Sequence, residues 1–149
     1  MASNSVIISD PAFEAGLAKL RDRSLRPLAV RAIVADLTTI LAKGAISPPP
    51  SPDEQIAIIV VLRSGLAMME PFVSHLPTDT NMVIYHLGIF REKQSLQPIE
   101  YYNKLAPKSP KIKRAFILDP LVATGGTAGA AINILKSVFP IKGPPYGHS

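Results

Sequence analysis

The sequence contains no cysteine. This absence excludes disulfide bonds, thiolate metal sites and cysteine nucleophiles, and it agrees with the reducing, cytoplasmic location that we expect. Long apolar runs are also missing. The longest, Ile56–Leu62, has seven residues, whereas a membrane-spanning helix needs about 20. No basic segment followed by an apolar one opens the chain, so we expect neither a secretory signal nor a membrane partner.

What the chain does contain is enough apolar material for one packed domain. Of its 149 residues, 47% are hydrophobic and 18% are charged, which argues against a disordered chain. The net charge is +5, a balance that suits an anionic ligand such as phosphate or pyrophosphate. The basic residues are spread thinly, without a run of five or more, so a solvated basic surface is the alternative and we do not expect a nucleic-acid partner.

The first third of the chain is predicted to be helical. Asp10 can cap a helix whose first residue is Pro11 and which continues to about Arg21. Apolar residues spaced by three and four predict a second helix over Pro27–Lys43, after which Gly44 stands where a C-terminal glycine belongs. Residues 10–44 are therefore assigned to helices and the proline-rich Ser47–Pro52 to a loop, because proline neither donates to a sheet nor continues a helix.

The remainder alternates between strand and helix patterns. The β-branched run Ile56–Leu62 is typical of a strand buried on both faces of a parallel sheet. The other predicted elements are a helix at Gly65–Leu76 that contains Pro71, a strand at Met82–Leu87, a polar excursion over Arg91–Pro110 with a short strand at Ile99–Tyr102, a strand at Lys113–Leu118 and a helix at Ala128–Val138. This order predicts an α/β domain over residues 1–142, with its core at 55–138, and a flexible tail at 143–149.

One loop carries the pattern of an anion site. Asp119–Thr127, with the sequence DPLVATGGT, follows a buried strand and opens a helix. Gly125 and Gly126 lack a Cβ, so backbone N–H groups can approach an anion. Thr124 and Thr127 add hydroxyl donors, and the helix N-terminus adds a partial positive charge. The segment therefore predicts a phosphate-binding loop.

Asp119 stands at the end of the strand, where a carboxylate can accept hydrogen bonds from sugar hydroxyls or contact the water shell of Mg²⁺. An ordinary strand-to-helix turn is the alternative for this segment. The loop is neither a Walker A motif nor a Rossmann fingerprint, because the Gly-Lys-Ser/Thr ending and the G-x-G-x-x-G spacing are both missing.

Ile117–Thr127 resembles the signature of type I phosphoribosyltransferases that binds phosphoribosyl pyrophosphate (PRPP). Its Asp-Pro pair resembles the form of that signature found in uracil phosphoribosyltransferases. Val61–Met69 (VLRSGLAMM) is similar to that family's Leu-Arg-Ala-Gly loop. Gly88–Tyr102 (GIFREKQSLQPIEYY) is similar to its segment with an arginine, acidic residues, proline and aromatics. The resemblance covers most of residues 7–138. It implies the three-layer phosphoribosyltransferase fold with a mainly parallel sheet.

The resemblance also implies roles for particular residues. The loop Asp119, Pro120, Leu121, Val122, Ala123, Thr124, Gly125, Gly126 and Thr127 would hold the 5-phosphate and ribose of PRPP. Arg63 and Arg91 would contact the pyrophosphate, since guanidinium groups match phosphate oxygens. Mg²⁺ would be bound through PRPP rather than by direct protein ligands. The implied reaction transfers the phosphoribosyl group to uracil, giving UMP and pyrophosphate in pyrimidine salvage.

The chain departs from the family near its C-terminus. The family's Tyr-x-x-Pro-Gly-x-Gly-Asp segment, whose backbone contacts the pyrimidine, has no counterpart here, and the last strands of the sheet are also missing. We expect a truncated chain in which Lys113–Leu118 is an edge strand, open on its outer side. A second copy or another partner is expected to cover this edge. The alternatives to uracil transfer are a non-catalytic PRPP-binding or regulatory module and an inactive relic.

Overall fold

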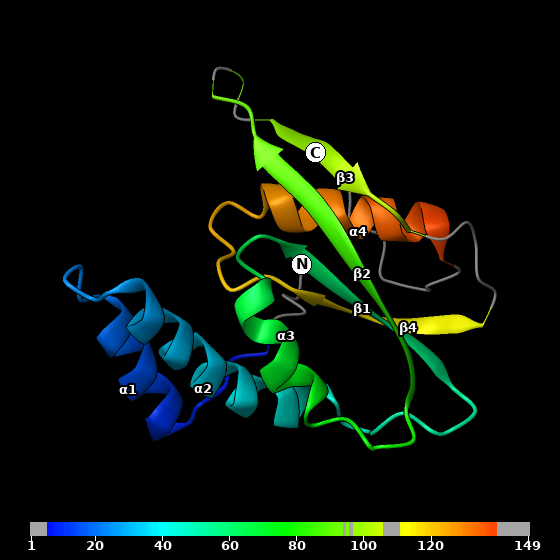
Figure 1. The fold of residues 1–149 in the computed structure, drawn as a ribbon, viewed down its shortest axis with the longest axis horizontal. Helices are drawn as coiled ribbons and strands as arrows, with labels where there is room; N and C mark the ends of the chain where they lie inside the picture. Colours follow the sequence, from blue (N-terminus) through cyan, green and yellow to red (C-terminus); the bar gives the residue numbers. More distant parts are fainter. Residues whose placement is uncertain (1–5, 94, 96, 106–110, 140–149) are drawn as a thin grey trace.

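The protein alternates between helices and strands, as the sequence predicts (Figure 1). The computed structural model describes residues 6–93, 95, 97–105 and 111–139 and, for Arg91 and Tyr101, the backbone alone. The predicted tail at 143–149 lies outside these residues. The elements are α1 (Pro11–Leu20), α2 (Pro27–Ala45), β1 (Gln55–Leu62), α3 (Leu66–Val73), β2 (Asn81–Arg91), β3 (Pro98–Asn103), β4 (Ile112–Leu118) and α4 (Gly126–Val138).

The strands form one sheet in the order β3-β2-β1-β4. β1 pairs in parallel with β2 and with β4, and β3 joins β2 in antiparallel orientation. Helices α2 and α3 pack on one face of this sheet and α4 packs on the other (Figure 1). The predicted three-layer α/β fold with a mainly parallel sheet is therefore confirmed. Within the described ranges β4 pairs with β1 alone, so its outer edge is open, as predicted.

The core is built around β1, which is buried along most of its length. Ile56, Ile58 and Val60 point to the face covered by α2 and α3, where Phe72 of α3 lies 5.1 Å from Phe116 between ring centroids. The alternate residues of β1, such as Ile59, pack against α4. Burial on both faces explains why the sequence of β1 is a continuous apolar run rather than an alternating one.

The two N-terminal helices form a hairpin, and α1 begins as predicted. The carboxylate of Asp10 accepts hydrogen bonds from the backbone N–H groups of Ala12 (2.8 Å) and Phe13 (3.1 Å), which caps the helix. The prediction for Gly44 was wrong. Helix α2 continues to Ala45, so Gly44 lies in its last turn rather than beyond its end.

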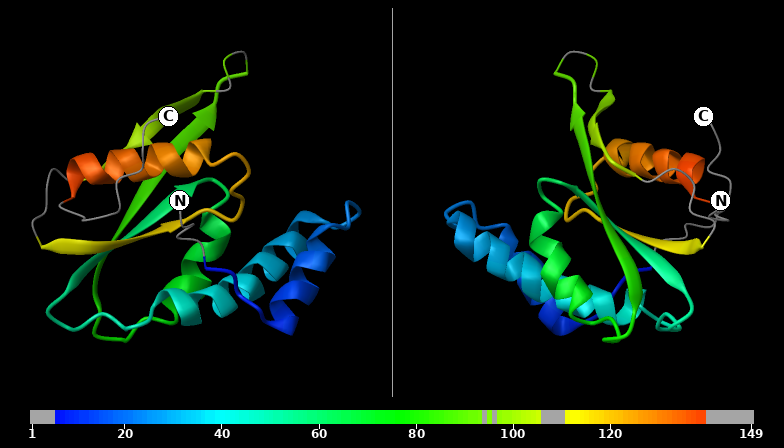
Figure 2. Two further views of the ribbon diagram at one scale, coloured as in Figure 1. Left: turned by 180° about the vertical axis from the view of Figure 1, so that it is seen from behind. Right: turned by 45° about the vertical axis from the view of Figure 1, so that its right-hand side comes forward.

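Three further boundaries differ from the prediction. α3 keeps Pro71 inside a helix that ends at Val73 instead of Leu76. β2 is longer than Met82–Leu87, because its last residues pair with β3 after its pairing with β1 ends at Gly88. The predicted excursion therefore contains a β2–β3 hairpin that projects beyond the sheet (Figure 2). α4 begins at Gly126, two residues before the predicted start at Ala128.

An ion pair attaches the edge strand to the segment before β1. The guanidinium of Arg114 in β4 donates to both carboxylate oxygens of Glu54, at 2.9 and 2.6 Å, and to the carbonyl of Pro48 at 2.7 Å. The hydrogen bonds from Arg114 lower the pKa of Glu54. The segment from Pro48 to Glu54 is thus held against β4 by three charge-assisted hydrogen bonds.

Candidate functional site

Two loops meet where β1 and β4 end. The strands are parallel neighbours, with Val60 opposite Leu118, so the segments that follow them leave the same edge of the sheet. The hydroxyl of Ser64, after β1, donates to the carboxylate of Asp119, after β4, at 3.4 Å. The structure therefore brings together the two loops that the sequence singles out, at the position where open α/β sheets bind ligands.

Gly65 makes the close approach of these loops possible. A Cβ at this position would lie 2.3 Å from the carbonyl oxygen of Leu118 and 2.7 Å from that of Val61. Both contacts are with backbone atoms, so rotation of a side chain could not relieve them. Any larger residue would push the end of β1 away from the end of β4.

The loop Asp119–Thr127 begins with a local turn. The carboxylate of Asp119 also accepts a hydrogen bond from the backbone N–H of Leu121 at 3.3 Å, and the loop is exposed from Pro120 to Thr124. The part of the loop before α4 ends at Gly125, whose φ of 81° is left-handed, and the last two loop residues, Gly126 and Thr127, are the first residues of α4. A Cβ on Gly125 would meet no atom within 4 Å, so it is the backbone conformation, and not lack of space, that favours glycine here.

The N-terminus of α4 faces this loop. Gly126 and Thr127 are its first two residues, and its first turn contains no acidic residue. The first N–H groups of a helix have no partner within the helix and carry a partial positive charge. A bound phosphate would satisfy both properties. Because no carboxylate in the first turn of the helix competes for these groups, the arrangement suits an anion.

The two predicted arginines occupy different parts of the fold. Arg63 is exposed on the loop after β1, next to Ser64. The peptide bond between Leu62 and Arg63 is cis. Arg91 is the last residue of β2, in the part of the strand that pairs with β3 rather than with β1. Arg63 therefore belongs to the junction of the two loops, and the backbone of Arg91 belongs to the projecting hairpin.

Ser64 is the residue that sequence reasoning left without a role. Ser64 belongs to the segment Val61–Met69, which was identified by its resemblance to a family loop, but its contact with Asp119 joins two separate loops. The signal available in the sequence was the pair of buried strands itself, because parallel neighbours bring the residues after their ends together.

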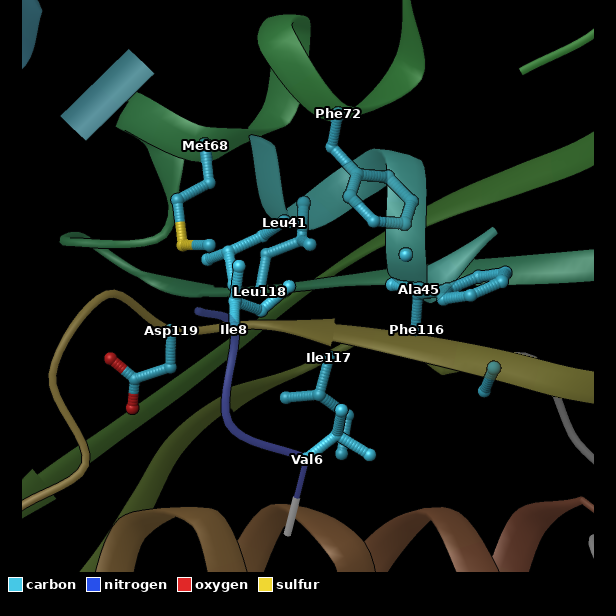
Figure 3. Close-up of a pocket in the computed structure, with 12 residues that line it drawn as sticks. Val6, Ile8, Leu41, Ala45, Met68, Phe72, Phe116, Ile117, Leu118 and Asp119 are labelled. Atoms are coloured by element: carbon cyan, nitrogen blue, oxygen red, sulfur yellow. The ribbon is translucent and has the colours of Figure 1, made fainter. Parts of the chain in front are cut away.

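An apolar groove of about 530 Å³ lies along β4 and takes its lining from both sides of the strand, with Met68 and Phe72 on the side of α3 and Ile117 and Val6 on the side of α4 (Figure 3). Asp119 lies at one end of it and is the only charged side chain among the described residues that line it. A groove of this composition does not suit a phosphate, and Asp119 is the one residue of the loop Asp119–Thr127 among the described residues that line it. The lining residues are Val6, Ile8, Leu41, Gly44, Ala45, Met68, Phe72, Ala115, Phe116, Ile117, Leu118 and Asp119.

Comparison with known proteins agrees with this geometry. The uracil phosphoribosyltransferase family model matches residues 49–141, which include β1, β4 and both loops. The protein urg2 of Schizosaccharomyces pombe is 49% identical over 134 residues, covering 90% of this chain and 62% of that protein. The uracil phosphoribosyltransferase of Roseiflexus castenholzii is 35% identical over 136 residues, covering 80% of this chain and 64% of that enzyme. The chain thus spans about three fifths of the length of these relatives.

Solved structures give the same result for the fold. The AQ2163 protein from Aquifex aeolicus superposes with a TM-score of 0.74 at 26% identity, over 89% of this chain and 70% of that one. A hypoxanthine-guanine phosphoribosyltransferase from Bacillus anthracis superposes with a TM-score of 0.53 at 11% identity, over 69% and 57%. The second likeness shows the fold alone. Because the family model matches residues 49–141, which include strands β1 to β4 and both loops, the chain belongs to the uracil phosphoribosyltransferase family.

Proposed function

We propose that the loop Asp119–Thr127 binds the 5-phosphate and ribose of PRPP, and that the chain transfers the phosphoribosyl group to uracil in pyrimidine salvage. The observation that carries this proposal is a loop that opens with the carboxylate of Asp119, held by Ser64 of the neighbouring loop, and closes with the left-handed Gly125 before α4. The loop offers backbone donors to a phosphate, and Asp119 offers acceptors to ribose hydroxyls. We place this activity in the cytoplasm, in agreement with the lack of cysteine.

The pyrophosphate of PRPP would lie toward the loop that follows β1. Arg63 is exposed there, and a guanidinium group can donate two parallel hydrogen bonds to phosphate oxygens. Arg91 would supply a second positive charge. Positive charge at this place stabilises the negative charge that develops on the leaving group.

Oxygen donors at the junction of the loops fit a hard cation. Among the residues that the structure describes, no group of three His, Cys, Asp or Glu side chains could hold a metal ion. Asp119 and Ser64 do present oxygen atoms of the type that Mg²⁺ prefers, and Mg²⁺ usually binds through substrate phosphates and one or two carboxylates. When bound with PRPP, the ion would supply additional neutralisation of the pyrophosphate charge.

The reaction needs no nucleophile from the protein. The bond between ribose C1 and the pyrophosphate oxygen breaks, a uracil nitrogen forms the new bond to C1, and that nitrogen loses its proton. The products are UMP and pyrophosphate. Positive charge develops on the ribose while the old bond is broken and the new one is incomplete, so the residues that hold the two phosphates in place would provide the catalysis.

A second function is a PRPP-binding or regulatory module without transfer. It is favoured by one observation, namely that the residues brought together at the junction of the two loops, Ser64 and Asp119, suit the phosphorylated sugar and not a base. The phosphate loop recognises the phosphorylated sugar, and recognition of the base requires other groups. A third possibility is a relic that binds neither substrate.

The deciding experiment follows UMP formation from uracil and PRPP with Mg²⁺, and binding of PRPP in the same sample by calorimetry. Uracil transfer predicts product well above that of Asp119→Ala and Thr124→Ala variants. Binding without product would assign the protein to the module without transfer. A protein that unfolds cooperatively yet binds no PRPP would refute the assignment of the loop.

A further inference from the structure

Most of the net positive charge is found in a short stretch remote from the PRPP loop. Residues 19–31 contain five of the 16 basic residues of the chain but only one of its 11 acidic residues. This stretch therefore has a net charge of +4, out of +5 for the whole chain. We call its five basic residues, Lys19, Arg21, Arg23, Arg26 and Arg31, the basic tip.

The fold places the basic tip at the turn between α1 and α2, far from the sheet (Figures 1 and 2). All five side chains are exposed. The acidic residue of the stretch, Asp22, is engaged in the turn, because its carboxylate accepts hydrogen bonds from the N–H (2.9 Å) and the hydroxyl (2.7 Å) of Ser24. The charge that is dispersed along the sequence is thus gathered on one end of the helical hairpin.

Apolar side chains are exposed beside these charges. Leu28, in the first turn of α2, is 81% exposed, and Leu17, one turn before Arg21, is 41% exposed. α1 contains no buried residue, and the buried residues of α2, Leu37, Thr38 and Ala42, all lie in its C-terminal half. The tip therefore combines arginines with an exposed leucine that nothing in the described core requires.

We propose that the basic tip binds the surface of an anionic lipid bilayer, with the arginines on the lipid phosphates and Leu28 inserted among the acyl chains. Cationic helical segments with exposed leucines bind bilayers in this way, without spanning them. No described helix is long and apolar enough to cross a membrane. The proposed contact is peripheral, and it replaces the expectation drawn from the sequence alone that the chain has no membrane partner. It is independent of the proposed transferase activity.

The composition of the tip favours lipid over nucleic acid. Residues 19–31 contain no aromatic residue, and proteins that bind single-stranded nucleic acid use aromatic side chains to stack bases. An exposed leucine contributes nothing to phosphate contacts along a duplex, but it adds binding energy when it is buried in acyl chains. The pair of features, net charge and Leu28, therefore fits a bilayer surface.

Co-sedimentation of the full chain with vesicles tests the proposal. We expect binding to phosphatidylcholine vesicles that contain phosphatidylserine, little binding to phosphatidylcholine alone, and loss of binding at high salt. Each arginine removed lowers the partition coefficient about fivefold, so the double variant Arg21→Ser/Arg23→Ser loses about 25-fold. The matched control Lys93→Ser/Lys111→Ser removes the same charge from exposed positions elsewhere and leaves partition within about twofold of the wild type.

Leu28→Ser separates insertion from charge attraction. It lowers the partition coefficient about tenfold, and this factor is the same at low and at high salt. Equal partition of the tip variant and the control variant, with both folded by circular dichroism, would overturn the proposal. So would binding of the wild-type chain to RNA at a salt concentration at which anionic vesicles are not bound, an outcome that would assign the tip to nucleic acid.

Discussion

Gly125 and Gly129 offer a matched test of how the proposed phosphate-binding loop, Asp119–Thr127, is built. Both are in the loop–α4 region, and a Cβ added to either would meet no atom within 4 Å. They differ in backbone conformation, because Gly125 has a φ of 81° and Gly129 lies inside α4. The same substitution by alanine should therefore have opposite effects on stability.

The magnitudes follow from the backbone alone. Alanine in the left-handed region costs about 1–2 kcal/mol relative to right-handed conformations, so Gly125→Ala should lower the free energy of unfolding by about 1 kcal/mol. Alanine inside a helix is favoured over glycine by about 0.8–1.0 kcal/mol, so Gly129→Ala should raise it. Both variants add the same methyl group to the unfolded chain, and the difference between them, about 2 kcal/mol, reports the folded conformation.

Urea unfolding of the two variants measures that difference, and PRPP calorimetry measures its functional consequence. Loss of one charge-assisted hydrogen bond to the phosphate weakens PRPP binding about tenfold. We expect this loss of affinity for Gly125→Ala and not for Gly129→Ala. If Gly125→Ala were as stable as Gly129→Ala, the left-handed conformation at the start of α4 would be refuted. If it were destabilised but bound PRPP normally, the loop would not be the phosphate site.

Four other predictions concern the junction, the ion pair and the open edge. Gly65→Ala should destabilise the fold by about 1–3 kcal/mol in urea, because its Cβ would clash with the carbonyl oxygen of Leu118; an unchanged midpoint would contradict the close approach. Ser64→Ala should leave the melting temperature unchanged and weaken PRPP binding about twofold to threefold by calorimetry, the effect of one exposed hydrogen bond of about 0.5 kcal/mol. Arg114 lowers the pKa of Glu54 from its ordinary 4.5, so the ion pair stabilises the fold above that pH and its contribution disappears as the pH falls through the lowered pKa. In thermal melts at a series of pH values, the wild type should therefore lose up to about 1 kcal/mol of stability on acidification that the Glu54→Gln variant does not lose. Light scattering should give a mass above that of one chain, since the open edge of β4 is expected to be covered by a second copy or another partner, and a monodisperse monomer would count against this.

The sheet could be predicted because its strands have unambiguous sequences. The run Ile56–Leu62 is apolar at every position, and burial on both faces is the condition that produces such a run. Lys113–Leu118 and the loop after it were identified for a related reason, since a glycine pair with threonines between a strand and a helix has few structural explanations. Where local sequence and global fold agree, a prediction from sequence succeeds.

The errors occur where tertiary contacts override local signals. Gly44 was assigned to the end of a helix, but the helix continues for one more residue, to Ala45. The length of β2 was underestimated because its final residues, Ile89–Arg91, pair with β3, and the local sequence does not specify this antiparallel partner. The hydrogen bond between Ser64 and Asp119 joins residues 55 positions apart and depends on the order of the strands.

The position of the basic tip bears on how the proposed activities combine. The N-terminal half of α2 is exposed or half-buried, and its buried residues lie close to the sheet. The basic tip and the loop Asp119–Thr127 belong to separate elements, the α1–α2 hairpin and the end of β4. If the two sites are independent, Arg21→Ser/Arg23→Ser should lose vesicle binding while its affinity for PRPP, measured without lipid, equals that of the wild type. A parallel loss of PRPP affinity would instead mean that the arginines attract the anionic ligand through the field of the whole protein, and raising the salt concentration would then remove the difference between the variant and the wild type.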